Sequence, residues 1–150
     1  MAVRQLRMYN DEILKKRCKE VSSIDGKVKQ LLEDMQDTLD TKPDAAGIAA
    51  CQVGSLKRVV VIRTENGVLK MVNPKIVAEE GSQECLEGCL SFPGRVGKTN
   101  RPQKVTVQAL DENGEEFTIE GEGELAKCFC HEIDHLDGKV FVDQVIEFIN

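Results

Sequence analysis

The chain has 150 residues, with 26 acidic and 20 basic side chains and a formal net charge of −6 at pH 7. It contains no basic stripe for a nucleic acid, no apolar run of membrane-spanning length and no apolar signal-peptide core at its N-terminus. We therefore expect a single domain over residues 1–150 of a cytoplasmic protein, whose six cysteines are thiols or metal ligands rather than disulfides.

Two helices are predicted near the N-terminus. Asn10 is a candidate N-cap for a short helix over residues 11–17, in which acidic side chains precede basic ones, as the helix dipole favours. A longer helix begins at Ser23 or Asp25 and keeps apolar residues at helical spacing to about Asp40, after which a proline ends it.

The middle of the chain changes to the period of strands. A turn at 65–67 joins two apolar runs, Pro74 interrupts the second run, and a turn at 111–114 joins an alternating strand to its return. The predicted strands cover residues 58–63, 68–72, 75–78, 104–110 and 117–120. This order of elements indicates an α+β fold, with two N-terminal helices, antiparallel strands and one late helix. The apolar residues that follow the late helix are expected to pack onto the core: Val140, Phe141, Val142, Val145, Ile146 and Phe148.

The late helix, predicted over 124–137 with Gly138 after its end, contains the only two histidines of the chain. His131 and His135 are four positions apart, so their rings share one helix face and can approach a common point. A divalent metal ion is the natural occupant of that point, and Glu132 could handle protons for a water on the ion. The alternative is a helix whose histidines serve only packing and hydrogen bonding.

A catalytic metal centre needs a third protein ligand. The extended motif HExxHxxGxxH is excluded, because Phe141 occupies its last position. Glu147 is close to the chain end, and Cys128 lies about 10.5 Å along the helix axis from His135, which suits a residue that lines the site. Cys89 is bracketed by glycines and a proline, where the backbone can approach another group closely. For Cys89, a thiolate ligand and a buried structural cysteine are equal alternatives.

A run of small residues at 45–50 precedes an amide side chain. Small residues permit the close approach of another chain's backbone, and Gln52 offers two N–H donors. The alternative is tight packing with Gln52 on the surface.

These stretches, in this order, resemble the motifs of the peptide deformylase family. The chain has AAGIAACQ at 45–52 where the family has GxGφAAxQ (φ apolar), EGCLS at 87–91 for EGCφS, and HEIDH at 131–135 for HExDH. The match extends to the segment 3–14 and to residues 137–138, so it covers nearly the whole chain.

The resemblance implies antiparallel strands wrapped around the C-terminal metal-binding helix. It implies a metal-dependent hydrolase that removes the N-formyl group, as formate, from the formyl-methionine of newly made polypeptides. The implied metal ligands are Cys89, His131 and His135, and the implied ion is Fe²⁺, with Zn²⁺, Ni²⁺ or Co²⁺ as possible replacements.

The resemblance also implies roles for other residues. Glu132 would transfer protons, while the Gln52 side chain and the Leu90 N–H would stabilise the oxyanion. An ion pair between Glu87 and Arg101 would hold the cysteine loop. The peptide would add as a strand, and the residues expected to bind it are Ala46, Gly47, Cys85, Gly88, Phe92 and Cys128.

Several positions depart from the family pattern. Ala45, Cys51 and Cys130 replace glycine, proline and glutamine, while Glu124 and Lys127 stand where the methionine pocket usually takes apolar residues. We expect a monomer that acts on nascent N-termini and binds neither a membrane nor a specific nucleic acid. A transient ribosome contact is a further expectation, although the chain ends without the basic C-terminal helix by which some members dock. The alternatives are an HExxH metallopeptidase and a non-enzymatic structural metal-binding module.

Overall fold

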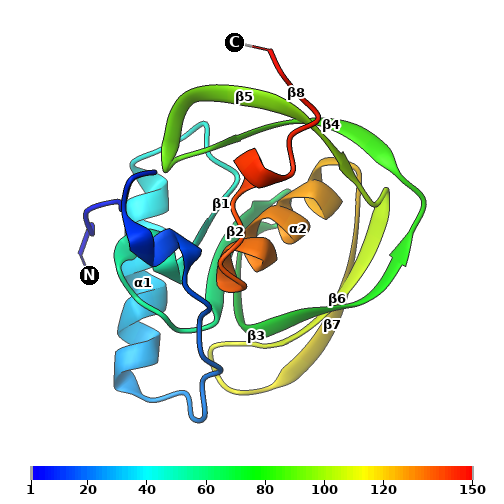
Figure 1. Cartoon of the computed structure of the whole chain (residues 1–150). Coiled ribbons are helices and arrows are strands. Elements are labelled where there is room, and N and C mark those ends of the chain that lie inside the picture. Colours follow the sequence, from blue (N-terminus) through cyan, green and yellow to red (C-terminus); the bar gives the residue numbers. More distant parts are fainter. Residues whose placement is uncertain (1, 150) are drawn as a thin grey trace.

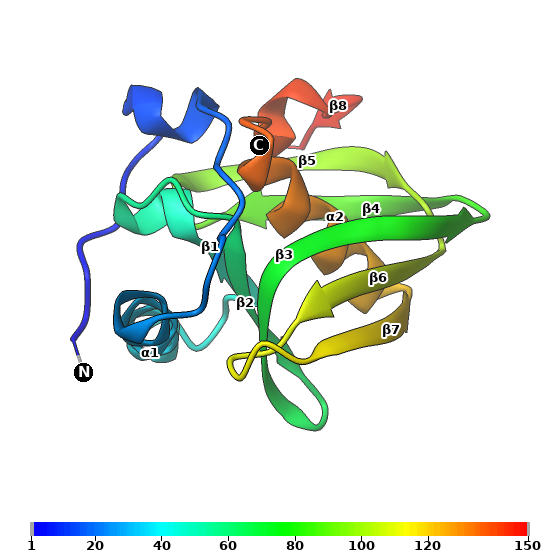
Figure 2. The same ribbon diagram turned by 90° about the horizontal axis from the view of Figure 1, so that it is seen from below.

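The helix that carries both histidines lies at the centre of the molecule, between two antiparallel sheets (Figures 1 and 2). The computed structural model describes residues 2–149. Its helices are α1 (Gly26–Asp40) and α2 (Glu124–Leu136), with the short 3₁₀ helices η1 (Glu12–Lys15), η2 (Ala50–Val53) and η3 (Phe141–Asp143). Its strands are β1 (Gly47–Ala49), β2 (Val59–Thr64), β3 (Gly67–Glu80), β4 (Gln83–Cys89), β5 (Phe92–Arg101), β6 (Lys104–Leu110), β7 (Glu116–Glu122) and β8 (Glu147–Phe148).

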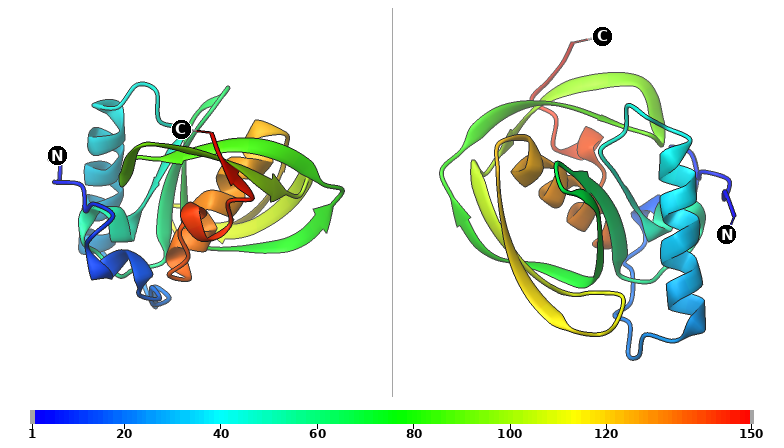
Figure 3. Two further views of the ribbon diagram at one scale, coloured as in Figure 1. Left: turned by 45° about the horizontal axis from the view of Figure 1, so that its top comes forward. Right: turned by 180° about the vertical axis from the view of Figure 1, so that it is seen from behind.

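The two sheets enclose α2, as the predicted α+β fold requires. The larger sheet has the order β1-β2-β3-β6-β7 and the smaller one β4-β5-β8. Helix α1 packs against β1 and β2 on the outer face of the larger sheet (Figure 3). Strands β1 and β4 are each the outermost strand of their sheet. Among residues 2–149, no helix combines the length and apolar character needed to cross a bilayer.

Strand β2 separates the two hydrophobic clusters. Val59 and Val61 join the cluster beneath α1, while Val60 and Ile62 join the cluster around α2. All four side chains are fully buried. A strand covered on both faces carries apolar residues without alternation, and this is the pattern from which the buried strand at 58–63 was predicted.

Helix α1 begins where its capping chemistry predicts. The Asp25 carboxylate accepts a hydrogen bond from the Val28 N–H at 3.0 Å, so Asp25 rather than Ser23 is the N-cap. The helix ends at Asp40, as predicted.

The first predicted helix is a single 3₁₀ turn. Its N-cap is Asp11, which accepts from the Ile13 N–H at 3.0 Å, so the expectation of Asn10 as the cap is wrong. The turn does not continue to residue 17, because the chain there leaves the helical course and the Cys18 N–H donates to the Leu136 carbonyl at 2.8 Å.

Strand β3 runs through Pro74 instead of stopping at it. The register with β6 shifts between Val72 and Lys75, and Asn73 has a positive φ of 52°. This bulge accommodates the proline, which has no N–H to give to the ladder. The Asn73 amide also bonds the Val21 N–H and carbonyl, at 2.8 and 2.9 Å. The predicted strands 68–72 and 75–78 are therefore one strand.

Strands β4 and β5 were not predicted. They pair in antiparallel fashion from Gln83 opposite Arg101 to Cys89 opposite Phe92, with a register shift between Glu87 and Cys89. The segment interpreted as a loop around Cys89 is thus the end of a strand and its tight turn.

The C-terminal segment packs less completely than expected. Val140 and Phe141 are buried, but Ile146 is 67% exposed and Phe148 39% exposed. The reason is that β8 pairs with the edge of β5 at Gly97 and Lys98 instead of entering the core. The expectation of a core position is therefore wrong for Ile146 and Phe148.

Gly138 follows α2 and packs closely against the backbone of Lys15. Its φ is +77°, and an added Cβ would lie 2.5 Å from the Lys15 carbonyl oxygen. We predict that Gly138→Ala lowers the free energy of unfolding by about 1–2 kcal/mol for the left-handed backbone and by about 1–3 kcal/mol more for the clash. Urea unfolding measures the loss.

Gly94 is the matched control for this substitution. It has the same φ of +77°, but no atom of residues 2–149 lies within 4 Å of an added Cβ. Gly94→Ala should therefore show only the backbone cost. Equal losses in the two variants would contradict the proposed contact between Gly138 and Lys15.

Candidate metal centre

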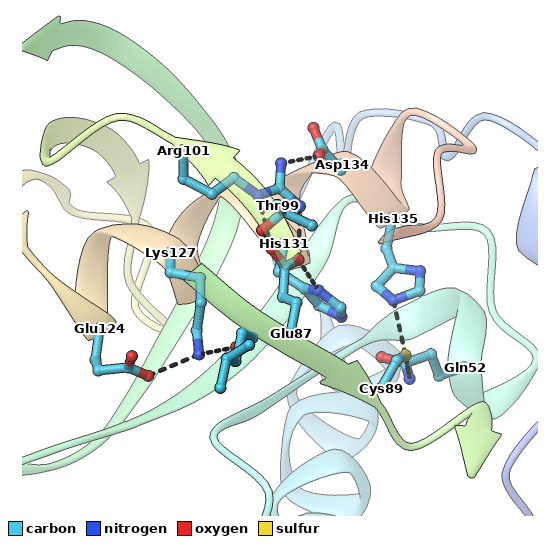
Figure 4. Close-up of polar contacts among 11 residues, drawn as sticks. Gln52, Glu87, Cys89, Thr99, Arg101, Glu124, Lys127, His131, Asp134 and His135 are labelled. Atoms are coloured by element: carbon cyan, nitrogen blue, oxygen red, sulfur yellow. Dashed lines mark hydrogen bonds and ion pairs between the residues drawn. The ribbon is translucent and has the colours of Figure 1, made fainter. Parts of the chain in front are cut away.

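Three potential metal ligands from two elements meet beside α2. His131 and His135 are one turn apart on the helix, with ring centroids 5.0 Å apart, and Cys89 reaches them from the end of β4 (Figure 4). The Cys89 Sγ lies 3.4 Å from the His135 Nε2. One potential ligand atom from each of the three residues falls within 4.8 Å of the others. The structure therefore brings together the three residues that the sequence singled out as ligands.

A buried carboxylate fixes the position of these groups. The Glu87 side chain is 2% exposed and accepts from the Arg101 Nε at 2.9 Å and from the Arg101 Nη2 at 2.6 Å, which confirms the predicted ion pair. It also accepts from the Thr99 hydroxyl and from the His131 Nδ1, the latter at 2.6 Å. Arg101 in turn donates to Asp134 at 2.7 Å, so β4, β5 and α2 share one network (Figure 4).

This network determines the charge of Glu87. Burial by itself raises the pKa of a carboxyl group, but the hydrogen bonds from His131, Arg101 and Thr99 outweigh it and hold the pKa of Glu87 well below its usual value. Glu87 is therefore ionised and can only accept hydrogen bonds, which places a proton on the His131 Nδ1 and makes Nε2 the nitrogen at which a metal would replace a proton.

The pKa values of the two imidazoles shift in opposite directions. Burial disfavours the charged form of both, but for His131 the contacts with Cys89 and Glu87 prevail, so its pKa rises well above the usual value. The pKa of His135 falls well below its usual value because of burial and then because of the neighbouring His131. The His135 Nδ1 has no hydrogen-bond partner among the described residues.

Gln52 enters the site from η2. Its Nε2 lies 3.5 Å from the Cys89 Sγ and 3.2 Å from the Ser91 hydroxyl, and its Oε1 accepts from the Ala49 N–H at 2.9 Å. The side chain is 1% exposed. The alternative interpretation of Gln52 as a surface residue is therefore wrong.

Glu132 lies on the inner side of α2, against β1. Its Oε1 is buried without a partner among the described residues, and burial raises the pKa of Glu132 to about 7. An added Cβ on Gly47 would lie 3.1 Å from the Glu132 Oε2. Gly47 therefore gives this carboxyl group the room it occupies.

A groove of about 880 Å³ opens onto the centre. It is lined by Cys89, His131, Glu132, Gln52 and Leu90, together with four of the residues expected to bind a peptide, Ala46, Gly47, Gly88 and Cys128. The other two lie elsewhere: Cys85 is buried within β4, and the Phe92 ring lies between those of Tyr9 and Phe141, with an edge-to-face contact to Phe141. His135 is not among the lining residues and is 1% exposed.

The groove also carries an ion pair. The Lys127 ammonium lies 2.7 Å from the Glu124 carboxylate and donates to the Leu86 carbonyl at 2.9 Å (Figure 4). The Lys127 side chain is 17% exposed, whereas Glu124 is 85% exposed. Lys127 thus forms part of the groove wall, and Glu124 lies at its outer rim.

The donor set suits a divalent transition metal. One thiolate and two imidazoles bind Fe²⁺, Zn²⁺, Ni²⁺ and Co²⁺. His131 already has the oriented Nδ1 that metal-binding histidines require. A structural site would need a fourth protein ligand, and none joins the three in the part of the chain that the structure describes. Three protein ligands are the number that catalytic metal centres use.

Three polar residues of the site escaped the sequence analysis. Thr99 binds Glu87, Asp134 binds Arg101, and Ser91 binds Gln52. Asp134 was visible only as the aspartate of the HExDH pattern, and Ser91 as the serine of EGCφS. Nothing in the sequence marked Thr99, because its partner is 12 residues away on a strand that was not predicted.

Comparison with known proteins gives consistent matches. The family model described as polypeptide deformylase matches residues 3–148. Peptide deformylase 2 of Clostridium acetobutylicum is 58% identical over 149 residues, which cover 99% of each chain. A peptide deformylase structure from Legionella pneumophila has a TM-score of 0.91 at 43% identity, covering 96% of this chain and 86% of the other. One from Thermotoga maritima has a TM-score of 0.92 at 34% identity, covering 97% and 99%.

Metal analysis tests the third ligand. Cys89→Ala removes the only sulfur of the donor set, so we predict that the purified variant loses most of its metal, which in the unsubstituted protein should be about one ion per chain. Cys130→Ala is the control, since Cys130 is a buried neighbour of His131 that contributes no donor. Full metal content in Cys89→Ala would exclude Cys89 as a ligand.

Proposed function

The chain belongs to the polypeptide deformylase family, and we propose from the geometry of its site how its own residues carry out the reaction. It is a metal-dependent hydrolase that removes the formyl group, as formate, from the N-terminal formyl-methionine of newly made polypeptides. The observation that carries the assignment of roles is the meeting of Cys89, His131 and His135 at the groove that also contains Glu132 and Gln52.

We propose Cys89, His131 and His135 as the ligands of a single Fe²⁺ ion, with Zn²⁺, Ni²⁺ or Co²⁺ able to take its place. Bound there, the cation would act as a Lewis acid that makes a water molecule nucleophilic near neutral pH. The hydrogen bond from His131 to Glu87 orients that ring, and the end of β4 positions the thiolate.

Glu132 is the proposed proton carrier. A carboxyl group with a pKa of about 7 can both take and give a proton at neutral pH. Its Oε1 has no competing partner among the described residues, so it is free to receive the proton of the attacking water and to pass it to the departing amine. Burial beside Gly47 keeps the group in place between these two steps.

We propose that two hydrogen-bond donors in the groove stabilise the oxyanion. The Gln52 Nε2 points toward Cys89, and the Leu90 N–H follows that residue directly in the chain. Donors fixed before the reaction stabilise developing charge without having to reorganise. We assign the Gln52 amide and the Leu90 backbone to this role.

We propose that the peptide binds between the outer edges of two strands. β1 and β4 are outermost strands of different sheets, and both contribute residues to the groove, Gly47 from β1 and Gly88 from β4. An extended peptide can add to such edges through main-chain hydrogen bonds, which do not depend on its side chains. Recognition through the main chain would admit many different N-termini.

We further propose that residues 1–150 act as one catalytic domain, and that the protein works in the cytoplasm as a monomer. Its substrates emerge from ribosomes, where the contact would be transient. The proposal of one catalytic domain is supported by the groove, because residues from both ends of the chain line it, from Val3 in the N-terminal segment to Glu132 on α2.

Replacing the proposed proton carrier tests the mechanism. Glu132→Gln keeps the size of the side chain but removes the titrating group, so we predict a loss of formate release from formyl-Met-Ala of about 10²–10⁴-fold in kcat. Metal analysis should show unchanged occupancy, because Glu132 is not one of the three ligands. Turnover close to that of the unsubstituted enzyme would contradict the assigned role.

A substitution of Lys127 tests how strictly the enzyme selects the side chain of the first residue of its substrate. We propose that this side chain enters between α2 and β4, where Lys127 presents an ammonium group in place of an apolar wall. Lys127→Leu should raise the ratio of kcat/KM for formyl-Met-Ala over formyl-Gln-Ala by about five- to tenfold.

The control for this ratio is a lysine on the larger sheet. Lys104→Leu removes an ammonium that pairs with Glu120 away from the groove, so the ratio should not move. An unchanged ratio in Lys127→Leu as well would place the ammonium out of reach of the substrate side chain.

A further inference from the structure

The amide of Gln52 is held at both of its ends. Its oxygen accepts from the Ala49 N–H at 2.9 Å, and its nitrogen donates to the Ser91 hydroxyl at 3.2 Å. The remaining N–H of the amide is directed toward the Cys89 Sγ, 3.5 Å away. A primary amide can be turned end for end with little change in shape, so these contacts decide which end faces the metal centre.

Ser91 can serve only as an acceptor for Gln52. Its hydroxyl has one proton, and it donates this proton to the Arg7 carbonyl at 2.7 Å. The lone pairs that remain can bind an N–H but repel a carbonyl oxygen. The Ser91 side chain is fully buried, so no solvent competes for these bonds.

The chain of hydrogen bonds ends on the N-terminal segment. The Arg7 N–H donates to the Gln52 carbonyl at 2.7 Å, while the Arg7 carbonyl accepts from Ser91. One residue outside any helix or strand thus connects η2 with the turn after β4. Because each donor and acceptor in this chain is used, reversing the amide would leave unfavourable pairs at both of its ends.

We propose that Ser91, held by the Arg7 carbonyl, is a positioning residue that keeps the Gln52 N–H directed at the reacting centre. The inference rests on the proposed function of Gln52 as an oxyanion donor. Ser91 itself does not touch the substrate. Its effect is to preserve an orientation that the transition state needs and that the ground state does not.

Steady-state kinetics separate this role from a general loss of structure. Ser91→Ala should lower kcat for formyl-Met-Ala by about tenfold with KM within about twofold, since the groove is unchanged. Ser91→Thr keeps the hydroxyl and should recover most of kcat. A normal kcat in Ser91→Ala would overturn the proposal.

A double-mutant cycle with Gln52→Ala gives the decisive comparison. If Ser91 acts through Gln52, then Ser91→Ala should cost less than about twofold in kcat in the Gln52→Ala background. Thr38 is the matched control: it is another buried hydroxyl that holds the N-terminal segment, accepting from the Arg4 N–H at 2.8 Å. Any loss of kcat in Thr38→Ala should therefore be additive with the loss in Gln52→Ala. Additive costs for Ser91→Ala would overturn the proposal.

A measurement without metal or substrate tests the same link. In the ¹⁵N–¹H spectrum of the metal-free protein, the side-chain amide signals that disappear in Gln52→Ala belong to Gln52. In Ser91→Ala these signals should shift and broaden, because the amide gains freedom to turn. Unmoved signals would contradict the positioning role. If Gln52→Ala leaves formate release intact, the oxyanion role of Gln52 fails, while the spectra still decide whether Ser91 orients the amide.

Discussion

The carboxylate of Glu87 is the constraint on which the rest of the site depends. It is buried among Arg101, Thr99 and His131, and it is ionised because these three groups donate to it. A carboxylate deprived of such partners in the interior would cost several kcal/mol, on the order of 3–5. These contacts hold the smaller sheet against α2, and they thereby position the Cys89 side chain two residues further along β4.

The position of α2 between two sheets accounts for the rigidity of the arrangement. The Phe129 and Leu136 side chains are fully buried, and the cluster around the helix includes residues from β2, β3 and β6. Interiors of this kind are close-packed, so the histidines have no alternative rotamers without disturbing their neighbours. The groove is open to solvent, but the side chains at its base are held as rigidly as those of a hydrophobic core.

Local periodicity was enough to predict α1, α2 and β6, because each has one apolar face of regular spacing. It failed for β4 and β5, and the reason is physical. The inward positions of these strands are occupied by Glu87, Thr99 and Arg101, which build the site instead of an apolar face. The ligands were identifiable because few residue types bind metals. The roles of the Ser91 and Thr99 hydroxyls could not be predicted, because they depend on partners that are distant in the sequence.

The distribution of the six cysteines has a chemical consequence. Cys89 is partly accessible, while the other five, Cys18, Cys51, Cys85, Cys128 and Cys130, are buried. Burial raises the pKa of the Cys128 thiol well above its usual value and that of Cys130 to about 12, which keeps both protonated. In the folded chain, Cys89 is therefore the cysteine most accessible to an electrophile arriving from solvent. An alkylating reagent should therefore react first with Cys89, and a metal ion bound to this sulfur would slow the reaction.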